Sequence, residues 1–152
     1  MSLRQRIEDL IHDLAFSMDE ERFDRYLASC SESFEYTISV DTPELGREAV
    51  WLHHDKAEMR DLFKGLRQHI RLQGQFLRQL SSPYVEVDGD GETATARTTF
   101  LTIYTELDGV SRVYAAGRYD DVFQTAGDSP LLAKRIVRLQ TRDLGPGSHL
   151  PL

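Results

Sequence analysis

The chain has 152 residues, a formal net charge of -7 and 40% hydrophobic residues, and its length and apolar content suit one domain with one core. The negative charge argues against binding to nucleic acid or to an anionic membrane, because like charge repels phosphate. No apolar run approaches the roughly 20 residues of a membrane span, and no uncharged apolar stretch follows the first residues, which argues against a signal peptide. The one cysteine, Cys30, cannot form an internal disulfide. We therefore expect a cytoplasmic protein with a buried, structural thiol.

Helical patterns open the chain. Ser2 and Gln5 have the spacing of a capping box, and apolar residues follow at helical spacing up to Met18. Asp19 is predicted to cap a short second helix, whose inner face would end at Cys30. The expected buried stripe of the first helix is Leu3, Ile7, Leu10, Ile11, Leu14 and Met18, and that of the second is Phe23, Tyr26, Leu27 and Cys30.

The period then changes to that of a strand. Apolar and polar residues alternate over 34–41, which predicts a half-buried strand that breaks at 42–46. The segment 47–54 has an ambiguous pattern. Asp55 and Glu58 form a second capping box for a third helix. The expected inner face of that helix is Met59, Leu62, Phe63 and Leu66.

From Ile70 onward the chain has strand patterns, with Gly74 predicting a bulge or sharp bend. The strand ending at 85–87 is followed by a hairpin turn at 88–91. Long strands are predicted over 93–107, 110–124 and 131–142, and strands of such length must coil. Helices grouped on one face of a strongly curved antiparallel sheet form a cone with an apolar interior. We expect one cone domain over 1–144 and an irregular tail over 145–152.

This order of elements resembles the NTF2-like, or SnoaL-like, cone fold. Four local segments further resemble the small β subunits of Rieske-type ring-hydroxylating dioxygenases, enzymes of aromatic compound catabolism. The segments are Phe23-Asp24-Arg25-Tyr26-Leu27, Phe34-Glu35-Tyr36-Thr37-Ile38, Gly117-Arg118-Tyr119-Asp120-Asp121-Val122-Phe123 and the ten residues from Arg135 to Leu144. The resemblance covers nearly the whole chain. The family often has a tryptophan at the start of the last strand, where this chain has Leu131-Leu132-Ala133.

The resemblance implies a non-catalytic, structural subunit. In such oxygenases the α subunit carries the Rieske iron–sulfur cluster and the mononuclear iron, whereas the β subunit forms a homotrimer and supports the α subunits. We therefore expect no catalytic residue, cofactor or metal in this chain, and a homotrimer bound to an α subunit as its partner. The residues agree on one point, because a lone cysteine cannot hold an iron–sulfur cluster.

The segment His53-His54-Asp55 is a candidate for metal binding, together with His69. Adjacent histidines diverge on a helix and point to opposite faces of a strand, so both rarely reach one ion. Asp55 already has a role as a helix cap. We therefore prefer exposed histidines in front of a capped helix.

The alternative function is that of a free-standing enzyme, similar to scytalone dehydratase-like or polyketide cyclase-like proteins. Such a dehydratase, isomerase or cyclase would place acid–base groups in the cone. The candidates for this role are Tyr36, Asp41, His53, His69, Tyr104 and Arg118. The competing interpretation is that the tyrosines fill the core and that Asp41 initiates the turn at Pro43. A cone protein that only binds a ligand is a third possibility.

Arginines crowd the last two long strands: Arg112, Arg118, Arg135, Arg138 and Arg142. Arg112 and Arg118 share strand parity with Asp120, which predicts charges of both signs on one sheet face. A polar interface between subunits explains such a face, because guanidinium groups pair well with carboxylates. We expect self-association through the outer face of the sheet.

Overall fold

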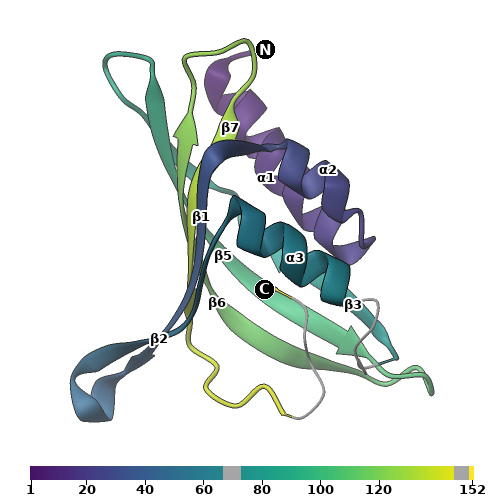
Figure 1. The fold of residues 1–152 in the computed structure, drawn as a ribbon. Helices are drawn as coiled ribbons and strands as arrows, with labels where there is room; N and C mark the ends of the chain where they lie inside the picture. Colours follow the sequence, from purple (N-terminus) through teal and green to yellow (C-terminus); the bar gives the residue numbers. More distant parts are fainter. Residues whose placement is uncertain (67–72, 146–150) are drawn as a thin grey trace.

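The computed structural model describes residues 1–66, 73–145 and 151–152. Within them, three α-helices lie on one side of a curved sheet (Figure 1). The helices are α1 (Leu3–Asp19), α2 (Phe23–Ala28) and α3 (Lys56–Leu66), with a short 3-10 helix, η1, at Pro43–Leu45. The strands are β1 (Cys30–Thr42), β2 (Arg47–Asp55), β3 (Gln75–Leu80), β4 (Tyr84–Val87), β5 (Thr93–Thr105), β6 (Ser111–Gln124) and β7 (Leu131–Leu139).

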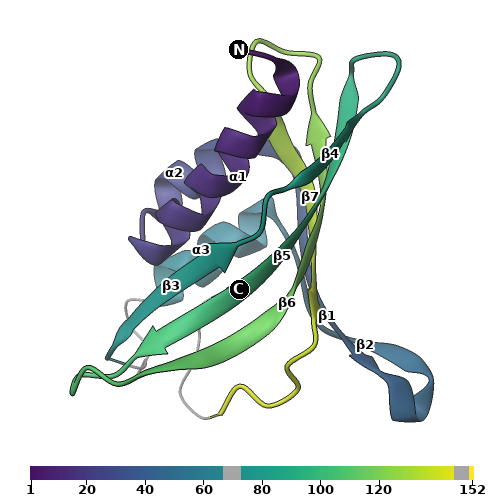
Figure 2. The same cartoon turned by 180° about the vertical axis from the view of Figure 1, so that it is seen from behind.

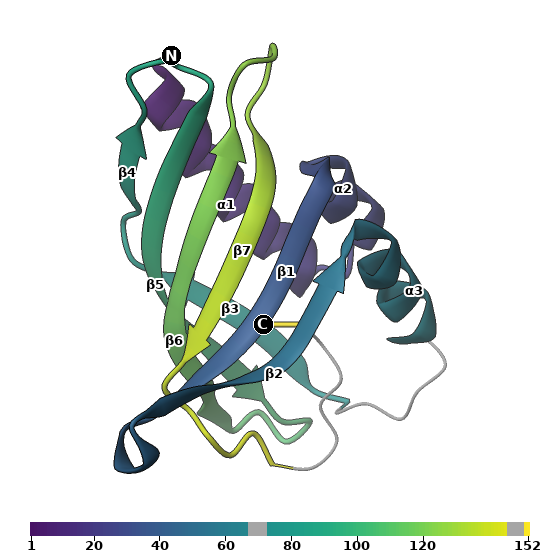
Figure 3. The same cartoon turned by 60° about the vertical axis from the view of Figure 1, so that its left-hand side comes forward.

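The sheet has the order β2-β1-β7-β6-β5-β3, with β4 also pairing β5 (Figure 2). Its pairs are antiparallel except β1 and β7, which run parallel. Seen from the strand side, α1 passes behind the sheet, and α2 and α3 lie beside its β1 and β2 edge (Figure 3). The predicted α+β cone is therefore confirmed, but its sheet is mixed at one pair and does not close, since β2 and β3 remain as edges.

Both predicted capping boxes are present. The Ser2 hydroxyl accepts from the Gln5 backbone N at 3.1 Å, and the Gln5 side chain accepts from the Ser2 backbone N at 2.9 Å. Asp55 and Glu58 exchange the equivalent bonds at the start of α3, at 2.8 and 3.2 Å. These bonds satisfy helix-end amides that have no partner inside the helix.

The predicted cap at Asp19 is wrong. Helix α1 includes Asp19, and the residue at the N-cap of α2 is Arg22, which makes no side-chain capping bond. The Asp19 carboxylate instead accepts from Arg78, whose backbone N lies at 3.0 Å and whose Nη1 lies at 2.5 Å. The Asp19 carboxylate therefore forms a long-range ion pair with Arg78 instead of the capping bond that the local pattern predicted.

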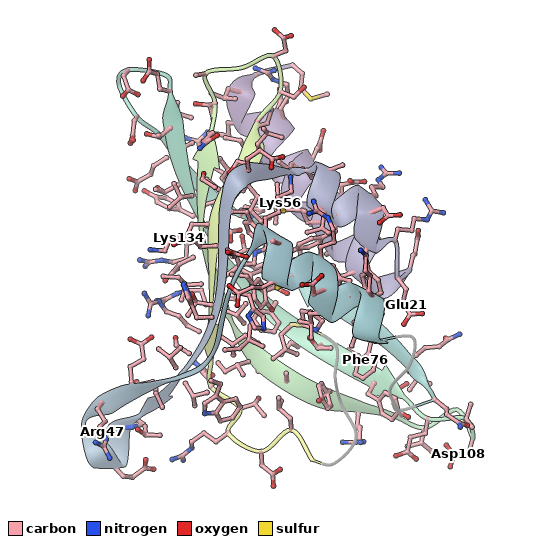
Figure 4. All side chains as sticks on the ribbon, in the orientation of Figure 1. Glu21, Arg47, Lys56, Phe76, Asp108 and Lys134 are labelled. Atoms are coloured by element: carbon pink, nitrogen blue, oxygen red, sulfur yellow. The ribbon has the colours of Figure 1, made fainter. Side chains whose placement is uncertain are left out.

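The ambiguous segment before α3 is a strand, β2, which pairs with β1 along its length. The two strands form a hairpin that projects from the body of the molecule, and Arg47 lies at its far end (Figures 1 and 4). The side chains of β2 are mostly exposed, and Val50 and Trp51 are 63% and 47% exposed. The sparse burial of this strand explains why its sequence shows no alternation.

Two irregularities shape the long strands. The expected bend at Gly74 is confirmed, and a Cβ there would lie 2.1 Å from the Thr105 carbonyl oxygen, so no side chain fits. The predicted strand residues Ile70 and Leu72 lie outside the described residues. A bulge near Thr102 and Ile103 shifts the pairing of β5 with β6. It places Arg112 opposite Tyr104, with its guanidinium 5.2 Å from the tyrosine ring.

The core fills the space between the helices and the concave sheet face. The aromatic rings of Phe23 and Phe63 stack at 4.4 Å, which joins α2 to α3. Phe100 and Tyr119 stack at 4.4 Å between β5 and β6. Other fully buried members are Ile7, Ile11, Leu14, Phe34, Tyr36, Met59, Leu66, Phe123, Leu132 and Leu139. Leu10 and Leu62, both expected in the buried stripes, are only partly buried.

Candidate functional site

The interior of the cone contains charged and phenolic groups within its apolar core. Tyr36 on β1, Arg78 on β3, Asp121 on β6 and Arg135 on β7 are each at most 7% exposed. All four point inward because they alternate with outward-facing neighbours along their strands. Burial of such groups is costly unless they are hydrogen-bonded, so their partners decide what the interior can do.

Pro151 and Leu152 lie in this interior. The Tyr36 hydroxyl donates to the Leu152 carbonyl oxygen at 2.7 Å and accepts from the Leu152 backbone N at 2.8 Å. Arg78 Nη2 donates to the Pro151 carbonyl oxygen at 2.6 Å. Leu152 is 3% exposed and belongs to the hydrophobic core. Residues 151 and 152 of the predicted tail thus lie inside the cone, while residues 146–150 lie outside the described part of the chain.

The Arg78 guanidinium connects three segments. Its Nη1 lies 2.5 Å from Asp19 at the end of α1, in an ion pair whose side chains are 2% and 10% exposed. Its Nη2 binds the Pro151 carbonyl, whereas its Nε has no hydrogen-bond partner. Arg78 thereby fixes β3 to α1 and to the segment inside the cone.

Asp121 and Arg135 form a second buried pair between β6 and β7. The guanidinium donates to both carboxylate oxygens, at 2.8 and 2.9 Å, and the side chains are 0% and 3% exposed. The guanidinium also lies 4.0 Å from the Tyr119 ring centroid. Burial raises the pKa of Asp121, while Arg135 acts in the opposite direction. Both charges are fully engaged with each other, so neither is presented to a substrate.

Burial also raises the pKa of the phenols and of the thiol in the interior. It raises the pKa of Tyr26 and Tyr36 well above the ordinary value for tyrosine. It raises the pKa of the Cys30 thiol to about 12, and Cys30 Sγ lies 3.3 Å from the Tyr26 carbonyl oxygen. These groups stay protonated at neutral pH, which makes Cys30 a poor nucleophile.

The candidate acid–base residues from the sequence do not form one cluster. Tyr36 and Tyr104 point inward, and the Tyr104 hydroxyl accepts from the Gly74 backbone N at 3.1 Å. Asp41 and His53 are exposed, and His53 Nδ1 lies 2.8 Å from the Thr37 hydroxyl. The remaining two candidates are Arg118, which lies on the outer face, and His69, which lies outside the described residues.

The histidines of the predicted metal cluster diverge. His53 and His54 are adjacent on β2, so they face opposite sides of the strand. His54 Nδ1 lies 3.4 Å from Glu58 Oε2, whereas His53 contacts Thr37. Among residues 1–66, 73–145 and 151–152, no three His, Cys, Asp or Glu side chains are placed to hold a metal ion.

Sequence reasoning missed the polar groups that line the interior. Asp121 and Arg135 lie within alternating strands, and each shares parity with a buried neighbour, Phe123 or Val137. That parity was a usable signal, because two opposite charges on inward-facing positions must pair. Arg78 gave the same kind of signal, because it shares strand parity with Gly74 and Phe76.

The outer sheet face carries a different set of charges. The Asp120 carboxylate accepts hydrogen bonds from Arg118 Nε at 3.0 Å and from Arg138 Nε at 2.5 Å. Arg138 Nη1 donates to the Glu48 carboxylate at 2.7 Å. Burial raises the pKa of Asp120, but the two guanidinium groups outweigh it and hold the pKa below its usual range. The prediction that Arg112 shares this face is wrong, because the bulge turns Arg112 toward Tyr104.

A shallow groove of ≈ 380 Å³ crosses this outer face. Tyr84, Arg97, Val122, Lys134 and Ile136 contribute to its lining. Lys134 projects away from the helices, on the opposite side of the sheet (Figure 4). Another open hollow, of ≈ 830 Å³, lies between α2 and α3. In the described part of the chain, no helix is both long and apolar enough to cross a membrane.

Comparison with known proteins agrees with this geometry. The model of the SnoaL-like domain family matches residues 1–129. The β subunit of 2-aminobenzenesulfonate 2,3-dioxygenase from Alcaligenes sp. is 30% identical over 146 residues, covering 96% of this chain and 97% of the relative. The β subunit of the methanesulfonate monooxygenase hydroxylase from Methylosulfonomonas methylovora is 27% identical over 154 residues, covering 96% and 85%.

A solved structure from Novosphingobium aromaticivorans, described as the β subunit of an aromatic-ring-hydroxylating dioxygenase, has the same fold. It superimposes with a TM-score of 0.81 at 20% identity, covering 92% of this chain and 90% of the other. The fold, the family match and the near-complete overlap with the first relative confirm the resemblance found in the sequence. This chain belongs to the SnoaL-like family and, within it, to the β subunits of ring-hydroxylating oxygenases.

Proposed function

We propose that this chain is a non-catalytic β subunit that supports the α subunit of a Rieske-type oxygenase. The carrying observation is its match, over 96% of its length, to a protein named as a dioxygenase β subunit. In the assembly, the α subunit would hold the Rieske cluster and the mononuclear iron. This chain would contribute shape and contacts, with no cofactor of its own.

The interior supports a structural role. The position where an enzyme of this fold would need substrate space is occupied by Leu152, held by the Tyr36 hydroxyl. The charged groups beside it are used in ion pairs between Arg78 and Asp19 and between Arg135 and Asp121. Groups that are already paired and closed off from water stabilise the fold and have no reacting atom to act on.

The outer face of the sheet has the features of a surface for subunit assembly. Its ion pairs are partly exposed, and its groove mixes apolar side chains with cations and carboxylates, as subunit interfaces do. We assign this face to a homotrimer of the chain, to which the α subunits bind. The assembly would work in the cytoplasm, without a nucleic acid or membrane partner.

The names of the two relatives also indicate a substrate class for the assembled enzyme. One is named for 2-aminobenzenesulfonate and the other for methanesulfonate. We therefore propose an organosulfonate as substrate of the complete oxygenase. The α subunit would bind it, so this part of the proposal concerns the assembly and can fail without affecting the subunit's role.

Charge reversal on the outer face tests the proposal. We would measure the mass of the chain by sedimentation, alone and with an α subunit encoded beside it, for wild type and Lys134→Glu. Lys64→Glu, on the exposed side of α3, is the matched control. We expect wild type and the control to form trimers and α complexes, and Lys134→Glu to shift toward monomer. A wild-type chain that stays monomeric at micromolar concentration and binds no α subunit would contradict the proposal.

A further inference from the structure

We propose that the cone contains a binding site for a short acyl-prolyl-leucine-like ligand, which Pro151 and Leu152 of the same chain occupy as an internal ligand. The proposal is independent of assembly with an α subunit. It rests on how these two residues are held, on what holds their partners in place, and on what their removal would leave behind.

The dipeptide is bound as a separate ligand would be. The leucine side chain is 3% exposed, and both backbone polar atoms of Leu152 bond to one group, the Tyr36 hydroxyl, at 2.7 and 2.8 Å. The Pro151 carbonyl receives Arg78 Nη2 at 2.6 Å. Proline has no N–H, so residue 151 brings no donor that would need a further partner. Proline followed by a branched apolar residue therefore suits the site chemically.

The receiving groups are fixed without the dipeptide. Asp19 holds Arg78 through both its backbone N and its Nη1, at 3.0 and 2.5 Å. Tyr36 lies in the middle of β1, which pairs with β2 on one side and β7 on the other. A site whose polar groups are already oriented loses little entropy when a ligand binds.

Removal of the dipeptide would leave these polar groups without partners. Arg78 Nε already has no hydrogen-bond partner, and the emptied site would add Arg78 Nη2 and the Tyr36 hydroxyl. Unpaired buried donors are costly, so a molecule that restores a carbonyl acceptor and an apolar branch should bind there.

The position of the dipeptide adds a mechanical consequence. Tyr36 is on β1 and Arg78 is on β3, which stand near opposite ends of the strand order and share no ladder. Pro151 and Leu152 therefore connect the two ends of an open, curved sheet across its concave side (Figures 1 and 3). Occupation of the site should raise the thermal stability of the whole domain.

A peptide added in trans tests the proposal. The chain is ended after residue 150, and its melting temperature is measured with and without N-acetyl-prolyl-leucine amide. We expect the shortened chain to melt several degrees below wild type, and the peptide at a hundredfold excess over its dissociation constant to raise that temperature by about 5–10 °C. N-acetyl-prolyl-glycine amide, which lacks the apolar branch, should give less than half of that shift.

Two controls make the result specific. The peptide should not shift wild type, whose site is occupied, and Tyr36→Phe in the shortened chain should abolish the shift. If the shortened chain is insoluble, the variant Leu152→Asp replaces it. A carboxylate is unfavourable at the buried, apolar position of the Leu152 side chain, so this variant should release the dipeptide from the site. An unchanged melting temperature after shortening, or a lowered one that the peptide does not raise, would overturn the proposal.

Discussion

Asp120 and Asp121 are neighbours on β6, yet they stand on opposite faces of the sheet and in different physical surroundings. Asp121 pairs with Arg135 inside the cone, where 0% and 3% of the two side chains are exposed. Asp120 pairs with Arg118 outside, where 25% and 38% are exposed. The inner pair is closed off from water within the core, whereas the outer charges are screened by water and remain available to a partner.

Breaking the inner pair should have the largest effect. Asp121→Ala leaves the Arg135 guanidinium buried without its partner, so we expect a loss of about 3–5 kcal/mol in unfolding free energy. Urea unfolding monitored by circular dichroism measures this change. The matched variant replaces both partners, Asp121→Leu with Arg135→Met, and should lose less than the single variant. A single variant within about 1 kcal/mol of wild type would show that Arg135 finds water or another acceptor.

A buried ring from the apolar part of the cone should matter almost as much. Phe63→Ala removes the partner that stacks on Phe23, and we expect a loss of about 3–5 kcal/mol. Leu10→Ala should cost about 1 kcal/mol, because Leu10 is only partly buried in α1. The same urea titration ranks the two. Equal losses would mean that the packing of α1 against the sheet differs from the structure.

The outer pair should have a small, pH-dependent effect. Since the pKa of Asp120 is lowered in the folded state, its charge stabilises the fold above the unfolded value of about 3.9. That contribution is lost as the pH falls through the folded pKa. Asp120→Asn should therefore cost less than about 1 kcal/mol at pH 7 and nothing well below pH 3. Denaturation curves at several pH values check this, and a constant difference at all pH values would contradict it.

The Cys30 thiol tests the closure of the interior without any change in stability. Because burial raises its pKa to about 12, a thiol reagent at pH 8 should react only as fast as the protein opens. Reaction followed by absorbance in native buffer and in denaturant measures the two rates. Rapid labelling in native buffer would show that the cone opens to water on its helical side.

Features that depend on residues close together in the sequence were predictable, whereas features that depend on distant residues were not. The capping boxes at Ser2 and Asp55 and the alternation of β1 depend on residues a few positions apart, so local patterns reveal them. The role of Asp19 depends on Arg78, 59 residues away, and no local pattern distinguishes a cap from a distant ion pair. The bulge that turns Arg112 to the other face is likewise set by pairing between β5 and β6.

The candidate site was less predictable than the fold. Tyr36 was identified as an inward-facing group, but its partner, Leu152, lies 116 residues later in an irregular segment. Nothing in a Gly- and Pro-rich tail indicates that it re-enters the core, because such a segment has no periodicity to show which side chains are buried.

The turnover of the reconstituted oxygenase tests the central claim most directly. The chain is purified with its α subunit, and substrate oxidation is measured per mole of complex for wild type, His53→Ala and Tyr36→Phe. For a structural subunit, activity follows the amount of complex and the turnover per complex stays within about twofold of wild type. Loss of an acid–base group would instead lower turnover by about 10²–10⁴-fold. Such a loss with assembly and stability unchanged would mean that this chain does chemistry itself.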